Sequence, residues 1–249
     1  MKLFSSEAAH DYGSYTFAYA NYCLRESKDT LADIYGLGFL PYSGARGTKD
    51  TFYMARSARV ALKGFELTSE NRRIAKKFDG TFEKQRIPFE KFKLTEKFFD
   101  FCLNYFATRH GAKVMPRERL ETILGSNLIS EIIEYRKDDR VVAYVLEVNE
   151  KKMAHFWFSF YDLSLTRQSL GLWLMLDCMR DAKNAGFSEY YIGTVYREKA
   201  LYKTNFEPLE WWNGQMWSAD MKLLRERSRS DENRSTTLID SWKENLKRF

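Results

Sequence analysis

Apolar residues recur at two different spacings along the 249-residue chain. In the stretch LTEKFFDFCLNYFATRHG, residues 94–111, they stand three and four positions apart, which predicts a helix with one apolar face that ends at Gly111. RERLETILG predicts a second, shorter helix that ends at Gly125. TSENRRIAKKF predicts a short basic helix with Thr68 or Ser69 as its N-cap.

The pattern changes to that of strands after residue 129. SEIIEYRKDDRVVAYVLEVNEKKMAHFWFSFYD holds two runs of β-branched and aromatic residues joined by the charged turn RKDD, and a third run after NEKK, which predicts an antiparallel meander. SLGLWLMLDCMRDAKNAGF then predicts a helix closed by Gly186. A strand (SEYYIGTVY), a short helix (REKALYKTNF) and a last strand or hairpin (EPLEWWNGQMWSADM) follow.

The chain divides where Pro88 and a cluster of charges interrupt the pattern. Before this point, GLGFLPYSG (36–44) reads as a loop, and DTFYMARSARVALKGFEL is β-rich. We expect an aromatic and basic N-terminal segment over 1–90, an α/β domain over 91–222, and a charged tail over 223–249 that is disordered or solvated.

Composition narrows the class of protein. Hydrophobic residues make up 44% of the chain, enough for a buried core, and the net charge of +6 points weakly toward a nucleic-acid partner. Cys23, Cys102 and Cys178 stand far apart without a zinc-binding spacing, so we expect reduced thiols, a cytoplasmic protein and no metal. The start of the chain has no apolar signal region, and no apolar run is long enough to span a bilayer, so we expect no membrane anchor.

The order of the predicted elements resembles the GNAT acyltransferase core, in which a meander feeds a helix, a strand, a helix and a strand. This resemblance implies a mixed α/β (α+β) fold: a GNAT-like mixed sheet with flanking helices, preceded by a small β-rich segment. At the strand-to-helix junction, Ser169, Leu170 and Gly171 leave backbone N–H groups free for an electron-rich ligand. Gln168 and Gly171 match the acyl-CoA motif, but Trp173 stands where that motif has a small residue, which disfavours CoA.

Four short motifs carry a more specific resemblance. In order and spacing, FYDLSLTRQSLGLWLML, EYYIGTVY, ALYKTNFEPLE and a closing MW resemble the carboxy-terminal domain of arginyl-tRNA protein transferases and their bacterial leucyl-transferring relatives. FYMARSARVALKGFELTSENRRIAKKF resembles the strand and basic helix of the same family. Two departures stand out. The family's cysteine cluster ahead of the basic helix is missing, and its Tyr-Asp-Pro-Asp is here Tyr161-Asp162-Leu163-Ser164.

The resemblance implies transfer of an amino acid from charged tRNA to the N-terminal amine of an acceptor protein or peptide. No cofactor is required, because the ester is already activated and the enzyme mainly orients the reactants. His10, His110 and His155 are scattered and are expected to be structural or on the surface. The implied catalytic residues are Asp162, Tyr161 and Tyr196, with Glu210 as a weaker carboxylate. The implied substrate-binding residues are Ser169, Leu170, Gly171, Tyr191, Tyr202, Lys203, Arg72 and Arg73.

Two other functions stay open at this point. The first is a CoA-dependent N-acyltransferase on the same fold, and the second is a non-catalytic module that binds tRNA or protein N-termini. We expect Arg72 and Arg73 to face the same cleft as Asp162, Gly171 and Lys203 if the aminoacyl transfer is correct.

Overall fold

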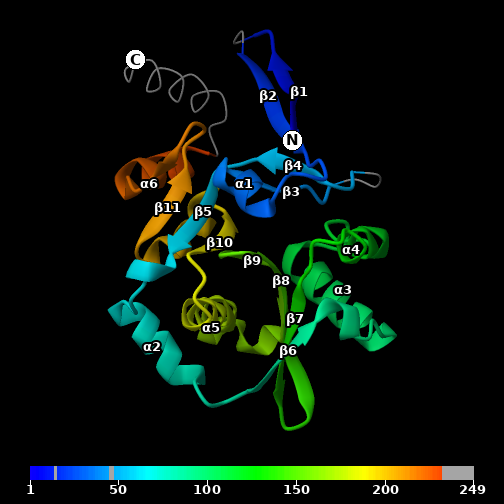
Figure 1. The fold of residues 1–249 in the computed structure, drawn as a ribbon. Helices are drawn as coiled ribbons and strands as arrows, with labels where there is room; N and C mark the ends of the chain where they lie inside the picture. Colours follow the sequence, from blue (N-terminus) through cyan, green and yellow to red (C-terminus); the bar gives the residue numbers. More distant parts are fainter. Residues whose placement is uncertain (14–15, 45–47, 232–249) are drawn as a thin grey trace.

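A computed structural model describes residues 1–13, 16–44 and 48–231 of the chain (Figure 1). The strands of the described part are β1 (Lys2–Asp11), β2 (Thr16–Leu24), β3 (Phe39–Pro41), β4 (Thr51–Met54), β5 (Ser57–Ala61), β6 (Glu83–Pro88), β7 (Glu131–Lys137), β8 (Arg140–Glu150), β9 (Met153–Tyr161), β10 (Glu189–Thr194), β11 (Leu209–Trp212) and β12 (Trp217–Ser218). The α-helices are α1 (Leu31–Gly36), α2 (Ser69–Phe78), α3 (Glu96–His110), α4 (Arg117–Leu124), α5 (Leu170–Asn184) and α6 (Met221–Ser230). Short 3₁₀ segments are η1 (Leu62–Gly64), η2 (Phe89–Lys91), η3 (Leu163–Gln168) and η4 (Glu198–Asn205).

The larger sheet has the strand order β12-β11-β5-β10-β9-β8-β7-β6. The predicted meander forms β7, β8 and β9, and α5 leads from β9 to β10, which runs parallel to β9. Helices α2 and α5 lie on one side of this sheet, and α3 and α4 lie on the other (Figure 1). The expected fold class, a GNAT-like mixed sheet with flanking helices behind a small β-rich segment, is confirmed. Two strands that precede residue 90, β5 and β6, are members of the larger sheet.

The predicted helices begin at the side chains that cap them. Thr68 accepts the Asn71 N–H at the start of α2, and Thr95 accepts the Phe98 N–H at the start of α3. Helix α5 begins differently, because its N-cap residue, Ser169, has a left-handed backbone with φ of 70° and makes no side-chain cap.

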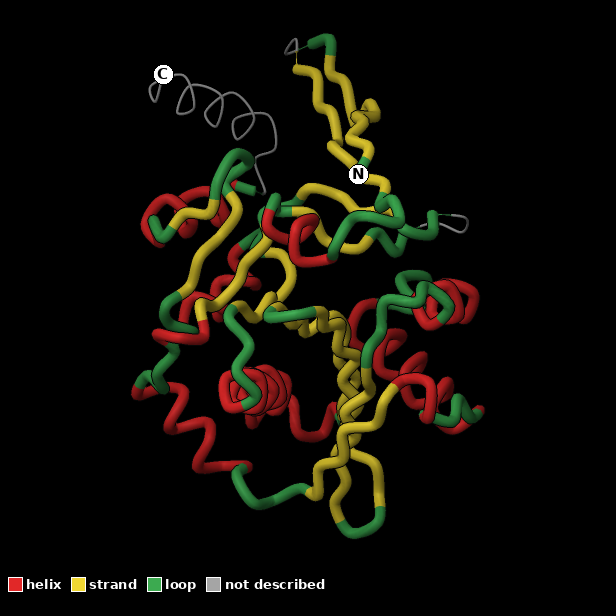
Figure 2. The backbone as a smooth tube through the Cα atoms, in the orientation of Figure 1, coloured by secondary structure: helices red, strands yellow, loops and turns green. Residues whose placement is uncertain are grey.

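A smaller sheet with the order β1-β2-β4-β3 precedes the larger one. Cys23, Phe39 and Phe52 pack with Ile34 of α1, so α1 covers one face of this sheet. The tube drawing shows the β1–β2 hairpin projecting away from the rest of the molecule (Figure 2). The loop predicted over 36–44 is wrong in its middle, since Phe39–Pro41 is a buried strand that pairs with β4.

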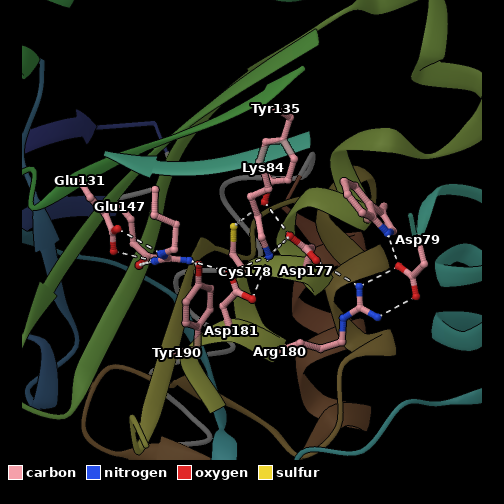
Figure 3. Close-up of polar contacts among 12 residues, drawn as sticks. Asp79, Lys84, Glu131, Tyr135, Glu147, Asp177, Cys178, Arg180, Asp181 and Tyr190 are labelled. Carbon is pink, nitrogen blue, oxygen red and sulfur yellow. Dashed lines mark hydrogen bonds and ion pairs between the residues drawn. The ribbon is translucent and has the colours of Figure 1, made fainter. Parts of the chain in front are cut away.

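A polar network fixes α5 to the edge of the larger sheet (Figure 3). The Lys84 ammonium donates to Asp177 and Asp181 of α5 at 2.8 and 2.7 Å. The Arg86 guanidinium, two residues along β6, reaches Asp181 at 3.0 Å and also pairs with Glu147. Glu147 is buried, and burial raises the pKa of its carboxyl to about 7. These bonds hold the amino-terminal strand β6 and the helix after the meander as one unit.

The first residues of the predicted tail are ordered. Leu224 and Ser228 of α6 are buried, so the expectation of a disordered or solvated tail is wrong for this helix. Asp231 then pairs with the Arg56 guanidinium at 2.8 Å. The rest of the tail, 232–249, lies outside the described residues. Within the described part of the chain, none of the helices is long and apolar enough to cross a membrane.

Candidate active site

The parallel strands β9 and β10 separate along their length and open a cleft. They pair at three positions, from Glu189 opposite Met153 to Tyr191 opposite His155. Beyond these pairs, β10 continues alongside β5, and β9 carries a bulge at Trp157 where its pairing with β8 shifts. Because each strand follows its other neighbour, a gap forms between their carboxyl ends.

This gap is part of a cleft of about 420 Å³ between the two sheets and α3. That volume falls within the range of small-molecule sites in proteins. The described residues that line it are Leu40, Pro41, Ser43, Tyr53, Tyr105, Phe106, His110, Arg119, His155, Phe156, Trp157, Phe158, Ser159, Met175, Ile192, Gly193, Thr194, Tyr202 and Lys203. None of these lining residues is an aspartate or a glutamate, whereas two of them, Arg119 and Lys203, are basic.

Lys203 is the most unusual group in the cleft. Its side chain is only 9% exposed, and its ammonium donates to the Thr194 carbonyl at 2.8 Å. An ammonium has three N–H donors, so two remain that no described residue accepts, and no described carboxylate lies within ion-pair distance. Burial lowers the pKa of the Lys203 ammonium to about 8. The cleft therefore contains a buried cation with two N–H donors available to bind an anion.

Gly193 lies beside this lysine near the end of β10. Its φ of +79° is a conformation that other residues rarely adopt, and a Cβ there would stand 3.5 Å from the Lys203 Nζ. The glycine in the EYYIGTVY motif thus serves the backbone turn at the end of β10.

His155 lies at the base of the cleft as a neutral imidazole. It is buried, and its Nδ1 is joined to the Tyr35 hydroxyl by a hydrogen bond of 2.9 Å. Burial, with a smaller contribution from the Lys203 charge, lowers the pKa of His155 to about 3. Such an imidazole is a poor proton acceptor near neutral pH. Its hydrogen bond with Tyr35 connects α1, which covers the smaller sheet, to β9 of the larger sheet.

Of the residues that the sequence indicated, Tyr202 and Lys203 line the cleft together. Tyr161 stands just behind the lining, with its ring centroid 4.8 Å from that of Tyr105. Its ring also covers Gly171, because a Cβ on Gly171 would lie 2.8 Å from the Tyr161 hydroxyl oxygen. The first turn of α5 is therefore packed under a phenol ring.

The other residues at the start of α5 do not line the cleft either. Leu170 is fully buried, and the Ser169 carbonyl accepts the N–H groups of Leu172 and Trp173 at 3.1 Å. The Trp173 side chain turns toward α2, where its Nε1 donates to Asp79 at 2.9 Å. Trp173 is therefore not the obstruction to CoA that the sequence indicated, and the ring against Gly171 is that of Tyr161.

Three further predicted residues lie outside the cleft lining and have partners of their own. The exposed Asp162 accepts the Ser164 N–H at 2.9 Å, as in a tight turn. The Tyr196 hydroxyl accepts the Arg56 N–H at 2.8 Å. Tyr191 is buried, with its ring 4.9 Å from that of Tyr35.

The two arginines of the basic helix are also outside the cleft lining, contrary to expectation. Arg73 pairs with Glu70 one turn earlier in α2, and Arg72 donates to the Leu67 carbonyl. Helix α2 packs on the side of the larger sheet that carries α5. Glu210 pairs with Arg59 at 2.8 Å.

Sequence reasoning missed His155, Arg119 and Tyr53 as members of the site. His155 and Tyr53 belong to strands whose alternation was visible, but nothing local indicates which face meets the cleft. Arg119 lies on α4 and donates to the Ser43 carbonyl at 2.8 Å, a contact across 76 positions of sequence.

Comparisons with known proteins identify a domain and several relatives by sequence. The model of an acetyltransferase (GNAT) domain matches residues 95–204. The aspartate/glutamate leucyltransferase of Hyphomonas neptunium is 28% identical over 172 residues, which are 65% of this chain and 67% of that protein. The aspartate/glutamate leucyltransferase of Stutzerimonas stutzeri is 29% identical over 166 residues, 64% of this chain and 69% of that protein.

Among solved structures, the C-terminal domain of a putative lysylphosphatidylglycerol synthetase from Agrobacterium fabrum aligns with a TM-score of 0.43 at 16% identity. The alignment covers 72% of this chain and 52% of that one, and nothing about function follows from a likeness at this level.

The matched domain and the relatives together define the class of protein. The chain carries a GNAT-like domain, and the protein is an enzyme that transfers an acyl or aminoacyl group.

Proposed function

We propose that this enzyme moves an amino acid, leucine in the first instance, from charged tRNA to the N-terminal amine of a protein or peptide that begins with aspartate or glutamate. The names of the similar proteins support leucine and the acidic acceptors. The single structural observation on which the proposal depends is the buried Lys203, which donates to the Thr194 carbonyl and has no carboxylate partner in the described lining of the cleft.

An uncharged donor side chain suits the lining better than an arginyl group. A guanidinium entering the cleft would need a carboxylate partner, and the lining supplies cations instead. Phe106, Trp157, Phe158 and Met175 offer apolar surface to an isobutyl group. We therefore favour leucyl over arginyl transfer.

Lys203 would bind the side-chain carboxylate of the acceptor. Its two remaining N–H groups provide charge-assisted hydrogen bonds in a site that excludes much of the solvent. An acceptor with a neutral first residue leaves this cation unpaired and desolvated, which penalises the wrong substrate as well as favouring the right one.

The chemical step needs no cofactor. The acceptor's α-amino nitrogen attacks the ester carbonyl carbon, and the bond between that carbon and the ribose oxygen breaks. The ribose hydroxyl leaves with the proton that the amine gives up. Because an α-ammonium has a pKa near 8, an appreciable fraction of the amine is neutral at physiological pH. What this chain supplies is the orientation of two reactants in one cleft.

The test is transfer of radiolabel to synthetic peptides. Purified protein is mixed with leucyl-tRNA, arginyl-tRNA or acetyl-CoA and with peptides that begin with Asp, Glu or Ala, and an N-acetylated Asp peptide serves as the control. We expect label from leucyl-tRNA on the Asp and Glu peptides and none on the blocked peptide. Absence of transfer from every aminoacyl-tRNA, or transfer from acetyl-CoA alone, would contradict the proposal.

A further inference from the structure

A row of aromatic side chains crosses the smaller sheet. Phe4 of β1 stands opposite Tyr22 of β2, and Tyr22 stands opposite Tyr53 of β4. Residues that are directly opposite in a sheet share a face, and adjacent strands are about 4.8 Å apart. The rings of Phe4 and Tyr22 are stacked, with centroids 5.3 Å apart and 17° between their planes.

The row leads from solvent into the cleft. Phe4 is 48% exposed on the edge strand of the projecting hairpin, and Tyr53 lines the cleft. Tyr42 bridges the inner part of the row, since its ring lies 5.7 Å from that of Tyr22 and 6.0 Å from that of Tyr53. Leu40, opposite Tyr53 on β3, is also part of the cleft lining.

The charges along this path suit a polyanion. The positions that flank the row on the same face are Lys2, Leu24, Thr51, Ser6 and Ala20, which include one cation and no carboxylate, and the exposed Lys2 ammonium lies 3.7 Å from Glu26. At the inner end, Arg119 lines the cleft together with Tyr53, and Lys203 lies in the same cleft. Aromatic rings on which bases stack, beside cationic groups that attract phosphates, are the arrangement by which proteins hold single-stranded nucleic acid.

We infer that this aromatic row, Phe4–Tyr22–Tyr42–Tyr53, binds the single-stranded 3′ end of the donor RNA and directs its terminal ester into the cleft. The inference rests on the proposed aminoacyl transfer. A donor that carries its ester on the last nucleotide must bring unpaired bases to the cleft, and each base offers a face that stacks on an aromatic ring whatever its sequence.

The same hairpin provides a matched control. Phe17 and Tyr19 are 51% and 66% exposed, and they stand opposite His10 and Glu7 on the other face of the β1–β2 pair. Replacing both with alanine removes two aromatic rings from the hairpin, as the Phe4 and Tyr22 double variant does, but it leaves the aromatic row intact.

The experiment measures binding of uncharged RNA to the full-length protein by fluorescence anisotropy at one fixed salt concentration. Two probes are used: a labelled RNA hairpin with a single-stranded 3′-ACCA end, and the same hairpin with a blunt end. We expect the wild type to prefer the overhang, and Phe4→Ala combined with Tyr22→Ala to lose about tenfold of that affinity. Tyr22→Phe keeps the ring and should retain binding, as should Phe17→Ala combined with Tyr19→Ala.

Equal loss in both double variants, or no loss in the first, overturns the inference. Loss of affinity for an Asp peptide with unchanged RNA binding also overturns it, because the row would then hold the acceptor. If the first double variant unfolds, the exposed single change Phe4→Ala is measured in its place, and unchanged RNA affinity in that variant overturns the inference. The binding assay uses uncharged RNA and therefore does not depend on transfer. If the protein binds the overhang through Tyr22 but transfers no amino acid, the proposed function is refuted while the inference about the aromatic row is supported.

Discussion

Replacing Lys203 with methionine separates the stability of this protein from its activity. Burial lowers the pKa of the ammonium from 10.5 to about 8, and this difference corresponds to about 3 kcal/mol by which the charged side chain destabilises the folded state at pH 7. Methionine has a similar length and no charge. It loses the hydrogen bond to the Thr194 carbonyl, which is worth about 1–2 kcal/mol. We therefore expect Lys203→Met to be more stable than the wild type by about 1–2 kcal/mol at pH 7.

The pH dependence identifies the cause. Between the folded pKa of about 8 and the unfolded value of 10.5, the unfolded chain holds a proton that the folded chain has released. Raising the pH through this window removes the destabilisation that the buried charge causes in the wild type. Its free energy of unfolding should therefore rise relative to that of the variant by about 3 kcal/mol between pH 7 and pH 11.

Urea unfolding at a series of pH values measures both effects. Lys199→Met, an exposed change in the same 3₁₀ segment, is the control, and its effect should stay within about 0.5 kcal/mol at every pH. In the transfer assay, Lys203→Met should lose its preference for Asp over Ala peptides by tenfold or more, mainly through a higher KM. A stability difference that does not change with pH would refute the reasoning about desolvation, and an unchanged peptide preference would refute the role in recognition.

Three smaller predictions concern packing and pH. Because the pKa of His155 is lowered to about 3, wild-type stability should fall by about 2 kcal/mol between pH 8 and pH 5 relative to His155→Gln; parallel curves would contradict this. Gly171→Ala should destabilise by about 1–3 kcal/mol by clashing with Tyr161, and Tyr161→Ala should relieve the clash in a double-mutant cycle. Trp173→Phe should cost about 1 kcal/mol by removing the indole N–H bond to Asp79, which keeps its ion pair with Arg180, measured by thermal unfolding; no loss would mean that the bond is unimportant.

The local sequence pattern was sufficient to predict most of the helices and strands and their order. The helices capped by Thr68 and Thr95 begin where the sequence places them, and the meander of β7 to β9 follows the alternation of its residues. These features depend on neighbours within a few positions, so a single sequence contains their signal.

The assembly of the cleft depends on contacts that no local pattern records. Lys203 and Tyr202 were indicated by a motif, but the motif gave no sign that Lys203 is desolvated, because its surroundings come from β9 and β10 and from the smaller sheet. In the same way, Asp162 was chosen as a carboxylate at the end of a strand, and the structure places it at the surface with the Ser164 N–H. Long-range pairing decides which face of a strand meets the cleft.

The position of β5 has a consequence for how this polypeptide is made. β5 lies between β10 and β11. A segment synthesised early must therefore wait for one segment synthesised about 130 residues later and another synthesised about 150 residues later before its backbone hydrogen bonds form. Pairings across such distances slow folding, and a fragment that began at residue 91 would expose the bare borders of β10 and β11. Truncation at that point should yield insoluble material, whereas co-expression of the missing piece should rescue it.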